Sequence, residues 1–149
     1  MLGLLSLPRE PVLKTILCAV DESPGATEAV AVASRLSMDL GLRLVLAHVG
    51  DDHWPANGLS RGGAQAQGGQ RLLERIARKH SLGSADRRAE VGDRVSELSR
   101  IAGEEAAVVI VVGSCSRSWR RRGLVSRLSV ELRSTAPCPV VVVPPRPRR

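Results

Sequence analysis

KTILCAVDESPGA, residues 14–26, sets a strand-to-helix order that recurs along the chain. The apolar run TILCAV is too short for a helix and aliphatic enough for a buried strand. Ser23 and Pro24 then favour a helix start, because serine can cap unpaired N–H groups and proline tolerates the first helical position. A buried strand that leads into a helix is the unit of a parallel α/β sheet.

The next elements follow the same order. Apolar residues recur at helical spacing from Ala26 to Leu36, and Gly41 supplies a stop. Leu42 to Val49 reads as the second strand. Residues 50–69 show neither alternation nor a helical period, so they predict a long loop.

The second half of the chain continues the alternation of helices and strands. The predicted elements are a helix from Leu72 to near Gly83, a polar edge strand at 85–91, a helix capped by Asp93, a central strand at 107–112, a helix over Leu124–Leu132 and a strand at 138–143. Five strands alternating with four helices predict right-handed crossovers and a three-layer, doubly wound parallel sheet. In the order 3-2-1-4-5, ligands favour the crevice where strands one and four diverge. The segments to inspect are therefore 20–23 and 113–129.

Length and composition bound the molecule to one ordinary globular domain. Of the 149 residues, 43% are hydrophobic and 25% charged, which favours neither disorder nor a membrane protein. We expect an N-terminal extension at 1–10, a single domain at 11–144 and a basic tail at 145–149. The stretch before Pro8 is apolar but has no basic start and is too short for a secretory signal or a membrane span.

Charge and cysteine content indicate which classes of partner and which cellular compartment to expect. The formal net charge of +7 favours phosphate-bearing partners, although charge alone does not choose among them. Cys18, Cys115 and Cys138 are an odd set without metal-ligand spacing, which disfavours a disulfide framework or a zinc site. A cytoplasmic location is the expectation.

Five segments, in this order, resemble the universal stress protein family: ILCAVDESPGA, LAHVGD, VGD, VVGSCSR and APCPVVVVP. They cover nearly the whole chain. The resemblance implies a regulatory or stress-response protein with an adenine-nucleotide pocket, which takes ATP with Mg²⁺, or AMP. It implies no catalytic residue and at most slow, incidental ATP hydrolysis.

The resemblance also implies the residues of the pocket. Asp21 matches the aspartate that contacts the adenosine portion, and Ala19 and Val49 match positions that line the base. The family's phosphate loop reads G-x2-G-x9-G-[ST], and this frame falls on Gly113, Ser116, Ser126 and Arg127. Leu128 and Ser129 complete the implied pocket wall.

The altered loop has two interpretations, because only its first glycine is present. Serine at 116 and 126 adds a Cβ that would close or reshape a cradle left open by glycine, so ATP would bind weakly or not at all. Alternatively, the Ser116 and Ser126 hydroxyls and the Arg127 guanidinium form a modified phosphate site. The first interpretation makes the protein a dimeric interaction module with a protein partner.

Other polar residues carry competing interpretations. Asp21 can cap the turn that follows it as well as bind a ligand. His48 and His53 lack companions at ligand spacing and are read as ordinary histidines, so no metal site is expected. Cys115 lies among arginines and is either a redox-sensitive or a spectator thiol. No serine at 114, 116 or 118 lies in a nucleophile elbow.

The cluster Arg117, Arg120, Arg121 and Arg122 surrounds Trp119. It can be a solvated loop or a contact for nucleotide phosphates. Together with the tail PPRPRR, it can also be a nucleic-acid-binding surface whose affinity falls with added salt. No signature of sequence-specific nucleic-acid recognition supports the last reading. The strand Val140–Val143 would leave an exposed aliphatic edge in a monomer, so a homodimer through this strand is expected, as the family resemblance also implies.

Overall fold

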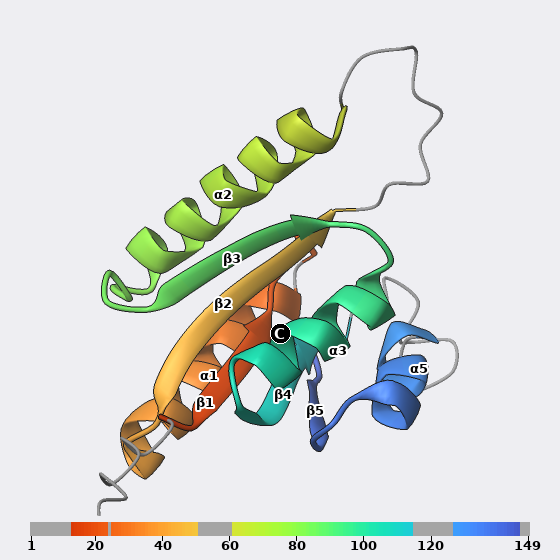
Figure 1. The fold of residues 1–149 in the computed structure, drawn as a ribbon. Coiled ribbons are helices and arrows are strands. Elements are labelled where there is room, and N and C mark those ends of the chain that lie inside the picture. The colour runs from red at the N-terminus through yellow and green to blue at the C-terminus, as the bar shows by residue number, and fades with distance from the viewer. Residues whose placement is uncertain (1–12, 24, 51–60, 115–126, 147–149) are drawn as a thin grey trace, which may run out of the picture.

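The computed structural model describes residues 13–23, 25–50, 61–114 and 127–146. They form a parallel five-stranded sheet in the order β3-β2-β1-β4-β5 (Figure 1). The strands are β1 (Thr15–Ala19), β2 (Arg43–Gly50), β3 (Asp86–Val91), β4 (Ala107–Gly113) and β5 (Val140–Val143), and the helices are α1 (Gly25–Leu40), α2 (Arg61–Lys79), α3 (Arg94–Glu104) and α5 (Arg127–Thr135). The predicted fold class and strand order are confirmed.

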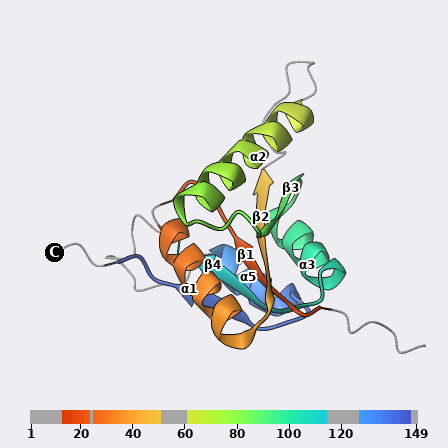
Figure 2. The ribbon, with the colours of Figure 1, turned by 90° about the vertical axis from the view of Figure 1, so that its left-hand side faces the viewer.

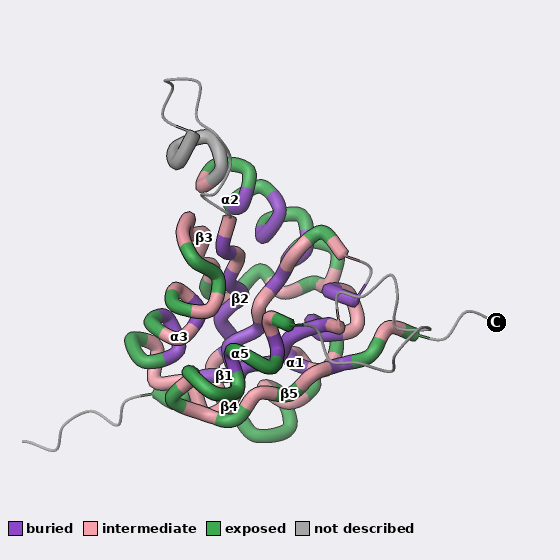
Figure 3. Tube along the Cα trace, turned by 90° about the vertical axis from the view of Figure 1, so that its right-hand side faces the viewer, coloured by how far each residue is buried: buried purple, intermediate pink, exposed green. Residues whose placement is uncertain are grey.

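Helices cover both faces of the sheet (Figures 1 and 2), and each face carries its own core. Successive residues of a strand point to opposite faces. Ile16 and Cys18 of β1 therefore pack in one core with α1 and α2, whereas Leu17 packs in the other with α3 and α5. Figure 3 shows the buried segments concentrated in the strands and the exposed ones on the outer helix surfaces. The aliphatic composition thus fills two layers on either side of a buried sheet.

Two predicted helix boundaries are confirmed. Helix α1 ends at Leu40, and Gly41 takes a φ of +64°, so that the Leu42 N–H can donate to the Ser37 carbonyl at 3.0 Å. Helix α3 begins at Arg94, where the Asp93 carboxylate accepts from the Ser96 N–H at 2.9 Å.

The predicted loop over 50–69 is wrong in its second part. Helix α2 begins at Arg61, whereas the apolar residues that predict this helix begin only at Leu72. Gly69 is buried, and a Cβ built there would lie 2.9 Å from His48 Cδ2 and 3.1 Å from Ala89 Cβ. The helix therefore contacts the sheet through a glycine, which adds nothing to a hydrophobic period.

Strand β3 lies at the edge, as its polar sequence predicts, and ion pairs tie it to its neighbours. Arg43 of β2 donates to Asp86 at 2.6 Å and to Glu105 at 2.8 Å. Arg88 of β3 donates to Glu90 at 2.9 Å and to Glu105 at 3.3 Å. These pairs join β2, β3 and the end of α3 into one polar network.

Several expectations fall outside the described residues. They concern the extension at 1–10, the central part of the predicted loop at 51–60, the arginine cluster with Cys115 and Trp119, the first turn of the predicted fourth helix at 124–126, and the last three residues of the tail. Among the helices that the structure describes, none has the length and apolarity needed to cross a bilayer.

Candidate functional site

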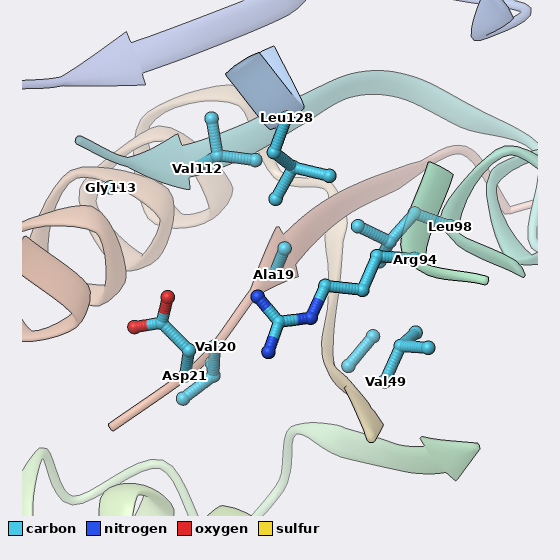
Figure 4. Close-up of a pocket in the computed structure, with 10 residues that line it drawn as sticks. Ala19, Val20, Asp21, Val49, Arg94, Leu98, Val112, Gly113 and Leu128 are labelled. Carbon is cyan, nitrogen blue, oxygen red and sulfur yellow. The ribbon is translucent and has the colours of Figure 1, made fainter. Parts of the chain in front are cut away.

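The strand register aligns the carboxyl ends of the three central strands. Ala19 of β1 is paired with Ala47 of β2 on one side and with Val112 of β4 on the other. A pocket lies at this edge (Figure 4), and the space within it, open solvent included, is about 380 Å³. Its lining consists of Ala19, Val20, Asp21, Ala47, Val49, Arg94, Leu98, Val112, Gly113 and Leu128. The pocket lies at the expected switch point between β1 and β4.

Five residues of the predicted site line this pocket: Ala19, Asp21, Val49, Gly113 and Leu128. They come from four separate elements or their ends, and the fold brings them together. The other four residues of the predicted site do not belong to the described lining.

Those four differ in their placement. Ser129 is fully buried inside α5 and Arg127 is exposed at the start of that helix, where its Nε donates to the Glu131 Oε1 at 2.9 Å. The Arg127 side chain is 92% exposed, so its guanidinium is not a wall of the pocket. Ser116 and Ser126 lie outside the described residues, and with them most of the predicted phosphate loop.

Asp21 shapes the turn between β1 and α1. Its Oδ1 accepts from the Ser23 N–H at 2.8 Å and also from the Ser23 hydroxyl. This is an Asx turn, in which a carboxylate holds the backbone two residues on. The turn directs the chain into α1, and Asp21 also borders the pocket. The capping interpretation and the pocket interpretation therefore apply to the same side chain.

His48 fixes the residue that precedes Asp21. The Val20 N–H donates to the Ala47 carbonyl at 2.7 Å, and the Val20 carbonyl lies 2.7 Å from His48 Nδ1. Because a carbonyl only accepts, Nδ1 must carry the proton. His48 thus acts as a positioning residue for the end of β1, which agrees with its reading as an ordinary histidine.

Gly113 has a packing role that does not involve a ligand. A Cβ built on Gly113 would lie 2.5 Å from the Gly25 carbonyl oxygen, and one built on Gly25 would lie 2.7 Å from the Ser114 carbonyl oxygen. The end of β4 and the start of α1 therefore touch backbone to backbone. This contact fixes the pocket edge at Gly113, because Gly113 itself lines the pocket.

Arg94 and Leu98 were not predicted as site residues. Both lie on α3, and in Figure 4 the Arg94 side chain extends into the pocket with its guanidinium toward the side formed by Ala19 and Asp21. The available signal was the Asp93 cap, which places the start of α3 directly after β3. Because all the strands are parallel, that start lies at the same sheet edge as the ends of β1 and β4.

The thiol behind the pocket is inert. Burial, followed by the charge of Asp21, raises the pKa of Cys18 to about 12, so the thiol stays protonated at neutral pH. Within the described lining, the charged residues are Asp21, whose carboxylate is an acceptor, and Arg94, whose guanidinium is a donor, and the other side chains are aliphatic. Such a lining suits a ligand with an apolar ring and polar edges.

Comparisons with known proteins agree with this architecture. Residues 13–144 match the universal stress protein family. A solved structure of a protein from that family from Burkholderia pseudomallei is 28% identical, with a TM-score of 0.67, covering 93% of this chain and 100% of that chain. A comparison with curated protein sequences finds no match.

Two further solved structures with the same fold are complexes with nucleotides. A universal stress protein in complex with cAMP is 18% identical, with a TM-score of 0.65, over 91% of this chain and 99% of that one. The universal stress protein from Archaeoglobus fulgidus in complex with dAMP is 19% identical, with a TM-score of 0.61, over 89% and 98%. At these identities the similarity establishes a shared fold.

Proposed function

The chain belongs to the universal stress protein family, and we propose that it binds an adenine nucleotide in the pocket beside Asp21, as part of a regulatory or stress-response role. The observation that carries this proposal is the convergence of Ala19, Asp21, Val49, Gly113 and Leu128 on one pocket. The family resemblance implies each of these residues, and they come from distant parts of the chain.

The chemistry of the lining fits adenosine. An ionised carboxylate only accepts hydrogen bonds, so Asp21 would receive them from ribose hydroxyls or from the exocyclic amine. Val49 and Leu128 would cover the faces of the base. With ATP, Mg²⁺ would accompany the phosphates. The binding of cAMP and dAMP by two structural relatives supports the same ligand class.

A thermal-shift titration of the purified protein with AMP, cyclic AMP and MgATP tests the proposal. A ligand that binds only the folded state raises the melting temperature in a dose-dependent way. Mass spectrometry of small molecules released from fresh protein gives an independent readout. If none of the three nucleotides raises the melting temperature at millimolar concentration, the proposal is wrong.

A second candidate is a dimeric interaction module that binds a protein partner instead of a nucleotide. It is favoured by the outer strand β5, in which Val141 is 38% exposed although its neighbours are aliphatic. An apolar edge strand is normally covered or paired. The module would form a dimer and show no response to nucleotides, which separates it from the first candidate.

The proposed compartment is the cytoplasm. Among the described residues, Cys18 is buried as a free thiol and Cys138 is half-buried and free. Unpaired thiols are typical of reducing compartments. The proposed single domain at 11–144 is consistent with the family match at 13–144.

A further inference from the structure

Arg94 is the cationic side chain in the described lining of the pocket. It is the first residue of α3, whose start is fixed by the Asp93 cap. Figure 4 shows its guanidinium directed across the pocket, on the side opposite Val112 and Leu128. A strand end, a capped helix and an aliphatic wall thus hold a positive charge over the space that a ligand would occupy.

The described neighbours leave this charge uncompensated. The acidic residues of α3 are engaged elsewhere, because Glu97 and Glu104 both pair with Arg100. Within residues 13–23, 25–50, 61–114 and 127–146, no hydrogen bond or ion pair involves the Arg94 side chain. Arg127, by contrast, is paired with Glu131 and points to solvent. An unpaired guanidinium in a pocket is available for an anionic ligand.

We propose that Arg94 is the phosphate-binding residue of this pocket, and that it selects nucleosides that carry a phosphate close to the ribose. The inference rests on the proposed nucleotide-binding function and assigns the anion contact to α3 instead of to Arg127. A guanidinium forks onto one phosphate with two parallel hydrogen bonds, so a single arginine matches a single phosphate group.

The two charges of the pocket also orient the ligand. A phosphate placed beside Asp21 would be repelled, whereas one placed beside Arg94 is attracted. The hydroxyl or amine donors of the nucleoside then face Asp21, and the phosphate faces the Arg94 guanidinium. The pocket therefore discriminates between a nucleoside and its monophosphate by charge, although both present the same base.

The test compares adenosine with AMP on the wild type, on Arg94→Gln and on Arg127→Gln by isothermal titration calorimetry. A hydrogen bond to a charged group corresponds to about ten- to a hundredfold in affinity, so the wild type should bind AMP at least about tenfold more tightly than adenosine. Arg94→Gln should remove this preference and leave adenosine binding within about twofold. Arg127→Gln should keep the wild-type preference. Arg94→Lys retains the positive charge but not the two parallel donors of a guanidinium. Its preference for AMP over adenosine should therefore lie between those of the wild type and Arg94→Gln.

Three outcomes overturn the assignment. Arg94→Gln can retain the preference for AMP, it can weaken adenosine and AMP equally, or Arg127→Gln can abolish the preference. Circular dichroism and melting temperature check that each variant folds, which is expected because Arg94 is exposed on the first turn of its helix.

Failure of the nucleotide proposal is distinguishable from failure of this one. If the wild type binds neither adenosine nor AMP, the nucleotide function is wrong, and pyrophosphate becomes the probe. Thermal stabilisation of the wild type by pyrophosphate that is lost in Arg94→Gln and retained in Arg127→Gln would support an anion site at Arg94 without a nucleoside. Equal responses of the wild type and Arg94→Gln to pyrophosphate would overturn it.

Discussion

At the scale of single residues, the contact between Gly113 and Gly25 fixes the edge of the pocket. We predict that Gly113→Ala destabilises the protein, because its Cβ would lie 2.5 Å from a backbone carbonyl oxygen that no rotamer change can move. Overpacking of this kind costs about 1–3 kcal/mol in the free energy of unfolding. Urea denaturation measures it.

Gly103→Ala is the matched control. A Cβ built on Gly103 meets nothing within 4 Å, and the residue lies in α3. Alanine there should stabilise the protein by up to about 1 kcal/mol through helix propensity. Equal effects of the two substitutions would contradict the packing role assigned to Gly113.

The Cys18 thiol predicts an alkaline limit of stability. Its pKa is raised from 9.0 to about 12 in the folded state, so the stabilisation of the neutral thiol is complete below pH 9 and is lost as the pH rises toward 12. The expected slope is at most about 1.4 kcal/mol per pH unit. Few other side chains titrate in this pH range, because the chain has two lysines and no tyrosine.

Urea denaturation between pH 8 and pH 11 measures this slope. Cys18→Ala should lower stability at every pH but flatten the decline above pH 9. Burial also raises the pKa of Cys138, so a smaller decline of the same sign should remain. If Cys18→Ala lost stability with pH as steeply as the wild type, ionisation of Cys18 would not be the cause of the decline.

Asp21 illustrates what sequence can establish for a single residue. Its type and its position after a buried strand predict a turn, and the family resemblance implies a ligand contact. The structure shows the turn and places Asp21 at the pocket, whereas the ligand contact stays a prediction. Arg94 could not be found in this way, because an arginine after a helix cap is most often a solvated residue. Only the parallel arrangement of all five strands brings it to the pocket.

At the scale of elements, α2 shows where hydrophobic periodicity fails. Residues 61–69 are rich in glycine and glutamine, and the buried position among those with described side chains is Gly69. A residue without a side chain can be buried against a strand but carries no apolar signal. The second half of α2, with Leu72, Leu73 and Ile76 in the core, was predictable for the opposite reason.

Gly69 and Gly68 form a test of this contact within one helix. Gly69→Ala should push its Cβ against the His48 ring, which lies 2.9 Å away and is held by the Val20 carbonyl. We expect a loss of about 1–2 kcal/mol in unfolding free energy. Gly68→Ala meets nothing within 4 Å and should stabilise by about 0.5–1 kcal/mol. Both values come from urea denaturation, and a neutral Gly69→Ala would refute close packing at this point.

At the scale of the whole molecule, the fold was predictable because the strands other than the polar edge strand β3 are largely aliphatic runs. Such runs occur in sheets covered on both faces, and the alternation with helices leaves few topologies. The pocket was predictable in place but incomplete in residues, because Arg94 and Leu98 belong to an element whose role at the edge depends on the three-dimensional arrangement. The predicted site residues at 116 and 126 lie outside the described residues and stay predictions.

The exposed strand β5 predicts the assembly. If two copies pair through Val140–Val143, multi-angle light scattering should give the mass of a dimer for the wild type and of a monomer for Val141→Arg, because arginine would place a charge in an apolar interface. Met38→Arg changes an apolar residue of α1 that is 72% exposed and should leave the dimer intact. A wild-type monomer would remove the basis for the interaction-module alternative.

Nucleotide binding at Asp21 is tested most directly by titration calorimetry of AMP against the wild type, Asp21→Asn and Glu22→Gln. Asparagine can still accept from Ser23 through its oxygen, so the turn is kept, while the carboxylate is lost. Glu22→Gln removes the same charge from an exposed neighbour. We predict saturable binding to the wild type and to Glu22→Gln, and about tenfold weaker binding, roughly 1.4 kcal/mol, to Asp21→Asn. No binding to the wild type, or equal binding to all three proteins, would contradict nucleotide binding at Asp21.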